Sequence, residues 1–179
     1  MSDIDSEWSD TTDLRRGAPL HDDLLALLPL LGVWRGHGEG VVPRTQEQFR
    51  FRQEIVFSHD GRPFLTYESR SWIVDDAGAT IRPGARESGF WRPGPGPDDF
   101  AVVLAVASGF AMLFTGTVGD LRWELGSAAV VEAPGAKDVV GERRLYALVG
   151  DGLGYATELA AMGLDYRPHL TAQLDRTKA

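Results

Sequence analysis

The sequence predicts an all-β protein, a closed or nearly closed antiparallel up-and-down β-barrel of about ten strands with one short N-terminal helix. Polar and apolar residues alternate through a series of short segments, a pattern typical of half-buried strands. Turn signals separate these segments at intervals near the 8–12 residues expected of a sandwich or barrel. Strands joined by short turns are antiparallel, and closing the sheet removes its exposed edges.

The predicted helix covers residues 21–31, HDDLLALLPLL. Its leucines at 24, 27, 28 and 31 share a stripe at helical spacing. Asp22 and Asp23 suit its first turn, where the helix dipole favours negative charge. We expect this helix to act as a plug or cover over the core.

After Gly32 the period of the pattern changes to two. Phe49, Phe51, Ile55 and Phe57 fall on one face of a strand, while charged residues fall on the other. Turns are predicted at 58–63, 75–79, 92–99, 108–109 and 150–152, which are rich in Gly, Pro, Asp and Ser. The strand segments between and after these turns are FLTYESRSWIV, RESGFWR, FAVVLAVA, FAMLFTGTV, LRWELGSAAVV, GERRLYALV, LGYATELAAM and HLTAQLDR.

Composition narrows the function. The 179 residues suffice for one domain, and we expect a single barrel domain over 20–179 behind a flexible acidic tail at 1–19. The net charge of −8 argues against nucleic-acid and anionic membrane partners. The chain has no cysteine and no apolar run near the ~18 residues that span a bilayer. A cytoplasmic location is therefore expected.

The stretch LLGVWRGHGEGVV places Gly36, Gly38 and Gly40 on one face of the first strand. A dinucleotide-binding loop needs G-x-G-x-x-G before a helix, whereas the spacing here is G-x-G-x-G and strands follow. Strand glycines permit a sharp bend or the close approach of another backbone or of a ligand. We favour the geometric explanation over direct ligand contact.

The four histidines at 21, 37, 59 and 169 form no zinc-type spacing. His169 stands out, because it follows Pro168 at the start of the last strand, and one histidine is enough to hold a haem iron. Alternation, however, puts His169 on the face opposite the apolar Leu170 and Leu174. An inward direction requires either leucines that pack outside the barrel or a β-bulge that re-aims the ring.

Other chemistry has less support. Ser88 does not lie in a G-x-S-x-G elbow, and the paired acids at 75–76 and 98–99 lie in turns. Arg143 and Arg144 are adjacent on a strand and must face opposite sides. One of the two either meets an anionic ligand or pairs with a buried acid such as Glu87.

Taken together, the motifs resemble those of the nitrobindins, which are relatives of the fatty-acid-binding proteins. The resemblance rests on G-x-W-x-G-x-G at Gly32, Trp34, Gly36 and Gly38 and on the closing H-L-x-A-x-L-x-R that begins at His169. Between them, SHDGRPFLTYESRSW, RESGFWR, ERRLYAL and LGYATELA follow in the same order. The match extends from about 24 to 176.

The resemblance implies a ten-stranded barrel that holds one haem b, with His169 as the iron ligand and catalytic residue. It also implies nitric oxide binding at ferrous iron and isomerisation of peroxynitrite to nitrate at ferric iron. Many family members carry a distal-side histidine where this chain has Ala85, and a histidine common in the strand before the A-S-G turn is replaced by Val106. The chain therefore looks like a divergent, mycobacterial-type branch.

Further site residues follow from their places in the matching segments. Ala85, Met112 and Leu159 are expected to form an apolar distal wall, and Arg143 is expected near a haem propionate. The alternative function is a non-catalytic carrier of a fatty acid or another small apolar ligand in the same cavity, since fold alone does not fix function. A homodimer is one open option for assembly.

Overall fold

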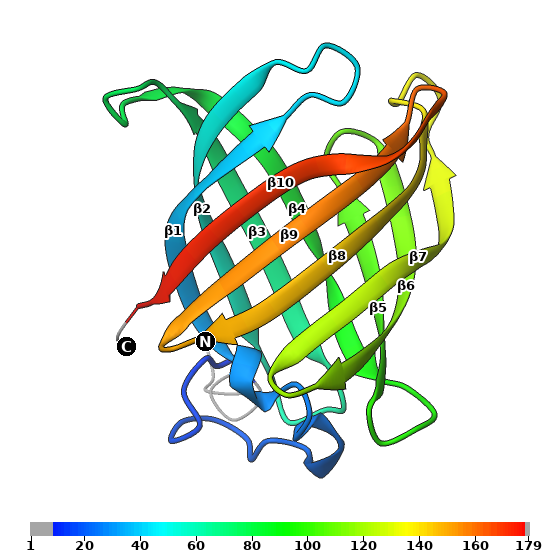
Figure 1. The fold of residues 1–179 in the computed structure, drawn as a ribbon. Helices are drawn as coiled ribbons and strands as arrows, with labels where there is room; N and C mark the ends of the chain where they lie inside the picture. Colours follow the sequence, from blue (N-terminus) through cyan, green and yellow to red (C-terminus); the bar gives the residue numbers. More distant parts are fainter. Residues whose placement is uncertain (1–8, 178–179) are drawn as a thin grey trace, which may run out of the picture.

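In a computed structural model that describes residues 9–177, the chain forms ten strands that close into one antiparallel barrel (Figure 1). Each strand pairs with the next along the chain, and the first pairs with the last. This arrangement confirms the predicted fold class. The strands are β1 Gly32–Val41, β2 Gln48–Ser58, β3 Leu65–Val74, β4 Thr80–Pro93, β5 Asp99–Val106, β6 Phe110–Gly119, β7 Arg122–Glu132, β8 Val139–Val149, β9 Gly152–Ala161 and β10 Leu164–Arg176.

The predicted helix at 21–31 is replaced by two short 3₁₀ turns, η1 Asp22–Leu24 and η2 Leu28–Leu30. Pro29 lies at the start of η2 and has no N–H to continue an α-helical ladder. Leu24, Leu27 and Leu30 are the residues that become fully buried. Their spacing of three matches the 3.0 residues per turn of a 3₁₀ helix, so the leucines still form one apolar face.

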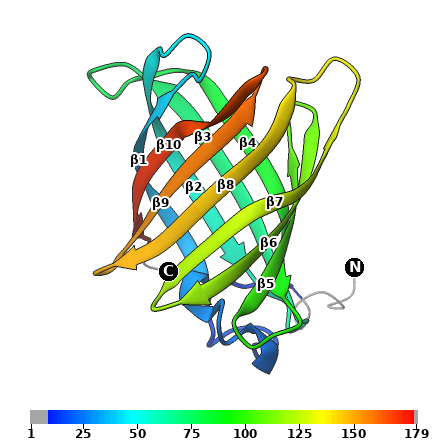
Figure 2. The same cartoon turned by 45° about the vertical axis from the view of Figure 1, so that its right-hand side comes forward.

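The two 3₁₀ turns cover one end of the barrel, as expected of a plug (Figures 1 and 2). Indole N–H groups from the barrel hold the segment in place. The indole of Trp34 donates to the carbonyl of Leu30 at 2.8 Å, and that of Trp123 donates to the carbonyl of Ala26 at 3.0 Å. Trp34 of the G-x-W-x-G-x-G motif therefore has a structural role at the covered end.

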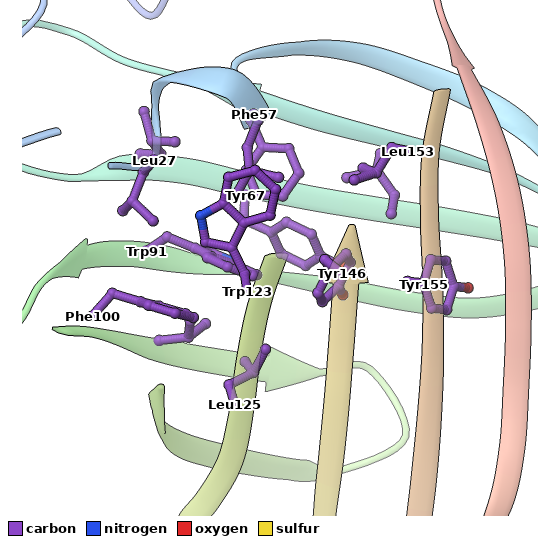
Figure 3. Close-up of a cluster of buried hydrophobic side chains, with 14 of the residues drawn as sticks. Leu27, Phe57, Tyr67, Trp91, Phe100, Trp123, Leu125, Tyr146, Leu153 and Tyr155 are labelled. Atoms are coloured by element: carbon purple, nitrogen blue, oxygen red, sulfur yellow. The ribbon is translucent and has the colours of Figure 1, made fainter. Parts of the chain in front are cut away.

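Aromatic side chains fill the interior behind this cover (Figure 3). The rings of Trp91 and Phe100 stack with centroids 5.2 Å apart, and Tyr146 meets the edge of Trp91 at 5.3 Å. Toward the other end, Phe49 and Leu170 are only partly buried. Close packing at the covered end thus leaves the opposite end as the open end of the barrel.

The glycines of β1 allow other chain segments to approach closely. A Cβ on Gly36 would lie 2.1 Å from the carbonyl oxygen of Gln173 in β10. A Cβ on Gly38 would lie 2.3 Å from the ring of Phe51 and 2.5 Å from the carbonyl oxygen of Thr171. The close approach of β10 and of the β2 aromatic rings accounts for this glycine face, while a bend of β1 at the closure of the barrel stays a prediction.

We expect Gly38→Val to destabilise the barrel by about 1–3 kcal/mol, the usual cost of overpacking a core. The added side chain must displace both a ring and a strand backbone. Urea unfolding of the variant measures the loss. Gly119→Val is the matched control, because a Cβ at Gly119 meets nothing within 4 Å. Equal stability of wild type and Gly38→Val would show that the close approach is not needed.

Described residues that precede the first 3₁₀ turn contact the barrel. The backbone of Thr11 pairs with that of His59 through hydrogen bonds of 2.8 and 3.0 Å. Residues 1–8 of the predicted flexible tail lie outside the described residues, and the division into a tail at 1–19 and a barrel at 20–179 stays a prediction. Within residues 9–177, no helix is long and apolar enough to cross a bilayer.

Candidate functional site

A β-bulge within β10, between Pro168 and Leu170, determines the direction of His169. Pro168 pairs with Glu158 of β9, and Leu170 pairs with Thr157, so His169 is an extra residue between two consecutive β9 partners. A bulge of this kind places two residues opposite one and re-aims a side chain. Because of the extra residue, His169 does not share the exposed face of Thr171, and it is half-buried beside Leu170.

The imidazole of His169 is held by a backbone carbonyl. Its Nδ1 lies 2.9 Å from the carbonyl oxygen of Val41, at the end of β1. Because a carbonyl only accepts, Nδ1 carries the hydrogen and Nε2 keeps its lone pair. The ring of Phe49 packs edge-on against the imidazole, with centroids 6.5 Å apart. This tautomer is the one in which Nε2 can coordinate a metal.

Burial also favours the neutral imidazole. Desolvation is the main cause that lowers the pKa of His169 below its ordinary value, and the cationic Lys137 and Arg144 act in the same direction. The hydrogen bond to Val41 and the charge of Glu87 partly oppose this shift. A lowered pKa keeps the ring uncharged near neutral pH, as iron ligation requires.

His169 lines a cavity of about 500 Å³ at the open end of the barrel, a size typical of small-molecule and cofactor sites. The rim is charged: Arg50 lies 3.7 Å from Glu39 and 3.5 Å from Asp76. The lining residues come from β1, β2, β3, β4 and β10 and the loops between them: Glu39, Gly40, Val41, Glu47, Gln48, Phe49, Arg50, Ile73, Val74, Asp76, Ile81, Pro168, His169, Leu170 and Thr171.

A buried ionic cluster lies in the barrel interior, centred on Arg144 of β8. Its guanidinium donates to both carboxylate oxygens of Glu87, at 2.8 and 2.9 Å, and to Glu142 at 2.9 Å. The hydroxyl of Tyr67 also donates to Glu87, at 3.0 Å. The Arg144 side chain is only 6% exposed, so two carboxylates share one buried guanidinium.

The two carboxylates of this cluster differ in their proton affinity. Burial raises the pKa of Glu142, and the charge of Glu87 raises it further, while Arg144 only partly offsets the rise. Burial alone would raise the pKa of Glu87 as well, but the charge of Arg144, the hydrogen bonds that Arg144 donates and the bond from Tyr67 lower it overall. Glu87 is therefore the charged partner, and Glu142 holds a proton more readily.

Of the two adjacent arginines, Arg143 lies on the surface and Arg144 is buried in an ion pair. Arg143 lies over the ring of Tyr166, 4.0 Å from its centroid, and 3.7 Å from Glu158, with 60% of its side chain exposed. Arg144 pairs with Glu87. Of the two alternatives that the sequence left open, the buried acid is therefore the partner and not an anionic ligand. The structure does not bring Arg143 together with His169 inside the barrel.

The predicted wall residues occupy three separate strands. Met112 is buried in the core, Leu159 is half-buried on β9, and Ala85 is exposed at an irregularity in β4, where its backbone bonds the hydroxyl of Ser71. None of the three is among the residues that line the cavity at His169. Sequence reasoning missed Phe49, Thr157 and the carbonyl of Val41 as neighbours of the site.

Together, the closed barrel, the inward imidazole and the adjoining cavity define a binding barrel that can offer one nitrogen ligand to a small molecule or cofactor. The chain belongs to the family described as "THAP4-like, heme-binding beta-barrel domain", whose model matches residues 23–176. This membership confirms the nitrobindin resemblance.

Named relatives extend the comparison. The chain is 44% identical over 173 residues to a peroxynitrite isomerase of Salinispora tropica, and the aligned region covers 94% of this chain and 88% of that protein. It is 44% identical over 169 residues to a ferric nitrobindin-like protein of Saccharopolyspora erythraea, covering 93% and 79%. The crystal structure of Rv2717c from M. tuberculosis superposes with a TM-score of 0.78 at 37% identity, covering 89% of this chain and 99% of that one.

Proposed function

We propose that the chain binds one haem b, with Nε2 of His169 as the protein ligand, and that it isomerises peroxynitrite to nitrate and binds nitric oxide. The observation that carries this proposal is the bulge at His169, which turns a neutral imidazole toward the cavity with Nδ1 fixed on Val41. The family and the activity named for the relatives support the same assignment.

The residues at the site fit a haem. A single histidine would suffice as the protein ligand, because the porphyrin itself would supply the other nitrogen ligands of the iron. The Val41 carbonyl is the kind of partner that fixes the tautomer and orientation of a ligating histidine. Phe49, Ile73 and Leu170 give the cavity apolar sides against which a flat macrocycle can pack. At the charged rim of the cavity, the propionate carboxylates of a haem would remain in contact with water.

In this proposal the residues of the chain bind the haem and shield it from water. His169 would hold the iron through its neutral nitrogen, and the apolar sides of the cavity would limit the access of water to the bound group. When bound, ferric haem supplies the Lewis-acid and one-electron chemistry by which the oxygen atoms of peroxynitrite rearrange to nitrate. The resemblance implies a histidine in many relatives where this chain has Ala85, so we expect few hydrogen-bond donors at the distal wall. The distal wall expected from Ala85, Met112 and Leu159 stays a prediction, since none of the three lines the cavity at His169.

The carrier alternative receives less support from the buried ionic cluster. A fatty-acid carboxylate inside a barrel needs a cationic partner. Arg144 already bonds Glu87 and Glu142, so the charge of Glu87 already balances the cation that an entering carboxylate would need. The haem propionates avoid this conflict if they face the rim.

Mixing haem-loaded ferric protein with peroxynitrite in a stopped-flow spectrometer tests the function. The proposal expects faster decay than with protein lacking haem, and nitrate as the main product. Haem uptake without faster decay would leave a haem-binding barrel without the isomerase activity. If the protein takes up no haem but binds a fluorescent fatty acid that an unlabelled fatty acid displaces, the carrier function would be favoured.

We also propose that two copies of the chain associate. Phe90, Val103 and Leu113 are in register across β4, β5 and β6, and each is 42–48% exposed on the outer face. A contiguous exposed apolar patch of this kind is typical of an interaction surface. Light scattering should give a dimer mass for the wild type and a monomer mass for Val103→Lys; a monomeric wild type would contradict this proposal.

A further inference from the structure

The bulge that directs His169 inward has a side-chain hydrogen bond at its centre. Thr157 lies on β9, directly opposite Leu170, and its hydroxyl oxygen accepts the backbone N–H of Leu170 at 3.2 Å. The residue is 4% exposed, so water does not readily replace this bond. On the other side of His169, Pro168 has no N–H to offer to a regular ladder.

Three features fix the position of His169. Pro168, the preceding residue, has no N–H for a regular ladder, and the Thr157 hydroxyl accepts the N–H of Leu170, the following residue. The Val41 carbonyl binds the imidazole ring itself. Without the extra residue, alternation would place the imidazole on the exposed face with Thr171. The direction of one side chain thus depends on a local irregularity in the β9–β10 pairing.

We propose that Thr157 is a positioning residue for His169: its hydroxyl, bound to the N–H of Leu170, holds the bulge that points the imidazole into the cavity. The proposal rests on His169 as the haem ligand only for its functional consequence. The orientation of the ring is a property of the protein without haem and can be measured there.

Two pairs of variants isolate the hydroxyl. Thr157→Val keeps the shape of the side chain and removes the acceptor, while Thr157→Ser keeps the acceptor. Thr157→Ala against Thr157→Ser gives a second comparison in case the valine variant does not fold. Thr115→Val is the matched control, since Thr115 is an exposed threonine on the outer face of β6. Circular dichroism and thermal melting establish that each barrel is folded.

The first measurement is ¹⁵N NMR of the His169 ring in the protein without haem. Wild type, Thr157→Ser and Thr115→Val should show the Nδ1–H tautomer, and Thr157→Val or Thr157→Ala should show a mixture of tautomers. A folded Thr157→Val protein that keeps the wild-type signature overturns the proposal. A role of Thr157 in general stability alone would lower the melting temperature without changing the tautomer.

The second measurement is haem titration. Removing a residue that orients a metal ligand typically weakens binding by about 10–100-fold, and we expect a loss in this range for Thr157→Val with recovery in Thr157→Ser. Equal haem affinity of wild type and Thr157→Val overturns the functional part of the proposal. If the wild type itself takes up no haem, the proposed function fails, while the NMR comparison still decides whether Thr157 orients His169.

Discussion

Replacing His169 with alanine should lower haem affinity by about 100-fold or more, beyond the 10–100-fold typical of the partners around a ligand. The variant loses the neutral nitrogen that the bulge and the Val41 carbonyl direct into the cavity. Only apolar packing and propionate contacts would remain. The haem-free barrel should keep its melting temperature within a few degrees, because haem stabilises the fold only in proportion to its binding.

Two controls make the result specific to the imidazole. His37→Ala removes an exposed histidine on the outer face of β1 and should leave the haem spectrum and affinity unchanged. His169→Gly with added imidazole should recover haem binding, since free imidazole can occupy the space left by the side chain. A His169→Ala protein with the wild-type haem spectrum and affinity would contradict the assignment.

Arg144→Met is expected to have the largest effect on stability, a loss of about 3–5 kcal/mol at neutral pH. Removing one partner of a buried ion pair leaves uncompensated charge, which is the origin of this magnitude. Here two buried carboxylates, Glu87 and Glu142, would lose the guanidinium that they share. For a chain of this length the change corresponds to a drop of about 6–20 °C in Tm, measured by calorimetry.

The pH dependence of this loss has a defined sign. In Arg144→Met, burial without the guanidinium raises the pKa of both carboxyl groups above the ordinary value of 4.5. A group whose folded-state pKa is raised is most favourable to folding at low pH, and this contribution is lost as the pH rises through the folded pKa. The gap in stability between variant and wild type should therefore narrow from pH 7 toward pH 4.5. A gap that widens on acidification would show that the carboxylates are not its cause.

The adjacent residue provides a matched control. Arg143→Met makes the same substitution one position earlier, on a side chain that is 60% exposed. Surface substitutions of this kind usually change stability by no more than about 0.5 kcal/mol. Comparable losses for Arg143→Met and Arg144→Met would contradict the assignment of the two arginines to opposite faces.

The barrel could be predicted because its strands obey simple rules over long stretches. Phe49, Phe51, Ile55 and Phe57 alternate on the inner face of β2 as the sequence pattern predicts. Gly- and Pro-rich turns separate most strands and fix their antiparallel order. The N-terminal helix was predicted wrongly because leucines at mixed spacings of three and four fit both helix types, and Pro29 decides for 3₁₀ turns.

The site was less predictable because its geometry depends on exceptions to those rules. Alternation alone points His169 outward, and one extra residue in β10 reverses that direction. Pro168 was the available signal, since proline within a sheet is confined to edges, strand starts and bulges. For Arg143 and Arg144 the sequence showed that the two face opposite sides but not which one faces inward. The Thr157–Leu170 bond joins segments whose pairing register no local pattern specifies.

Iron ligation by His169 is tested most directly by resonance Raman spectroscopy of the ferrous haem complex without added ligand. The structure predicts an iron–histidine stretching band that shifts when the protein is grown with ¹⁵N-labelled histidine and that is absent from His169→Ala. A wild-type spectrum without such a band, or a band that persists in His169→Ala, would contradict the assignment of His169 as the iron ligand.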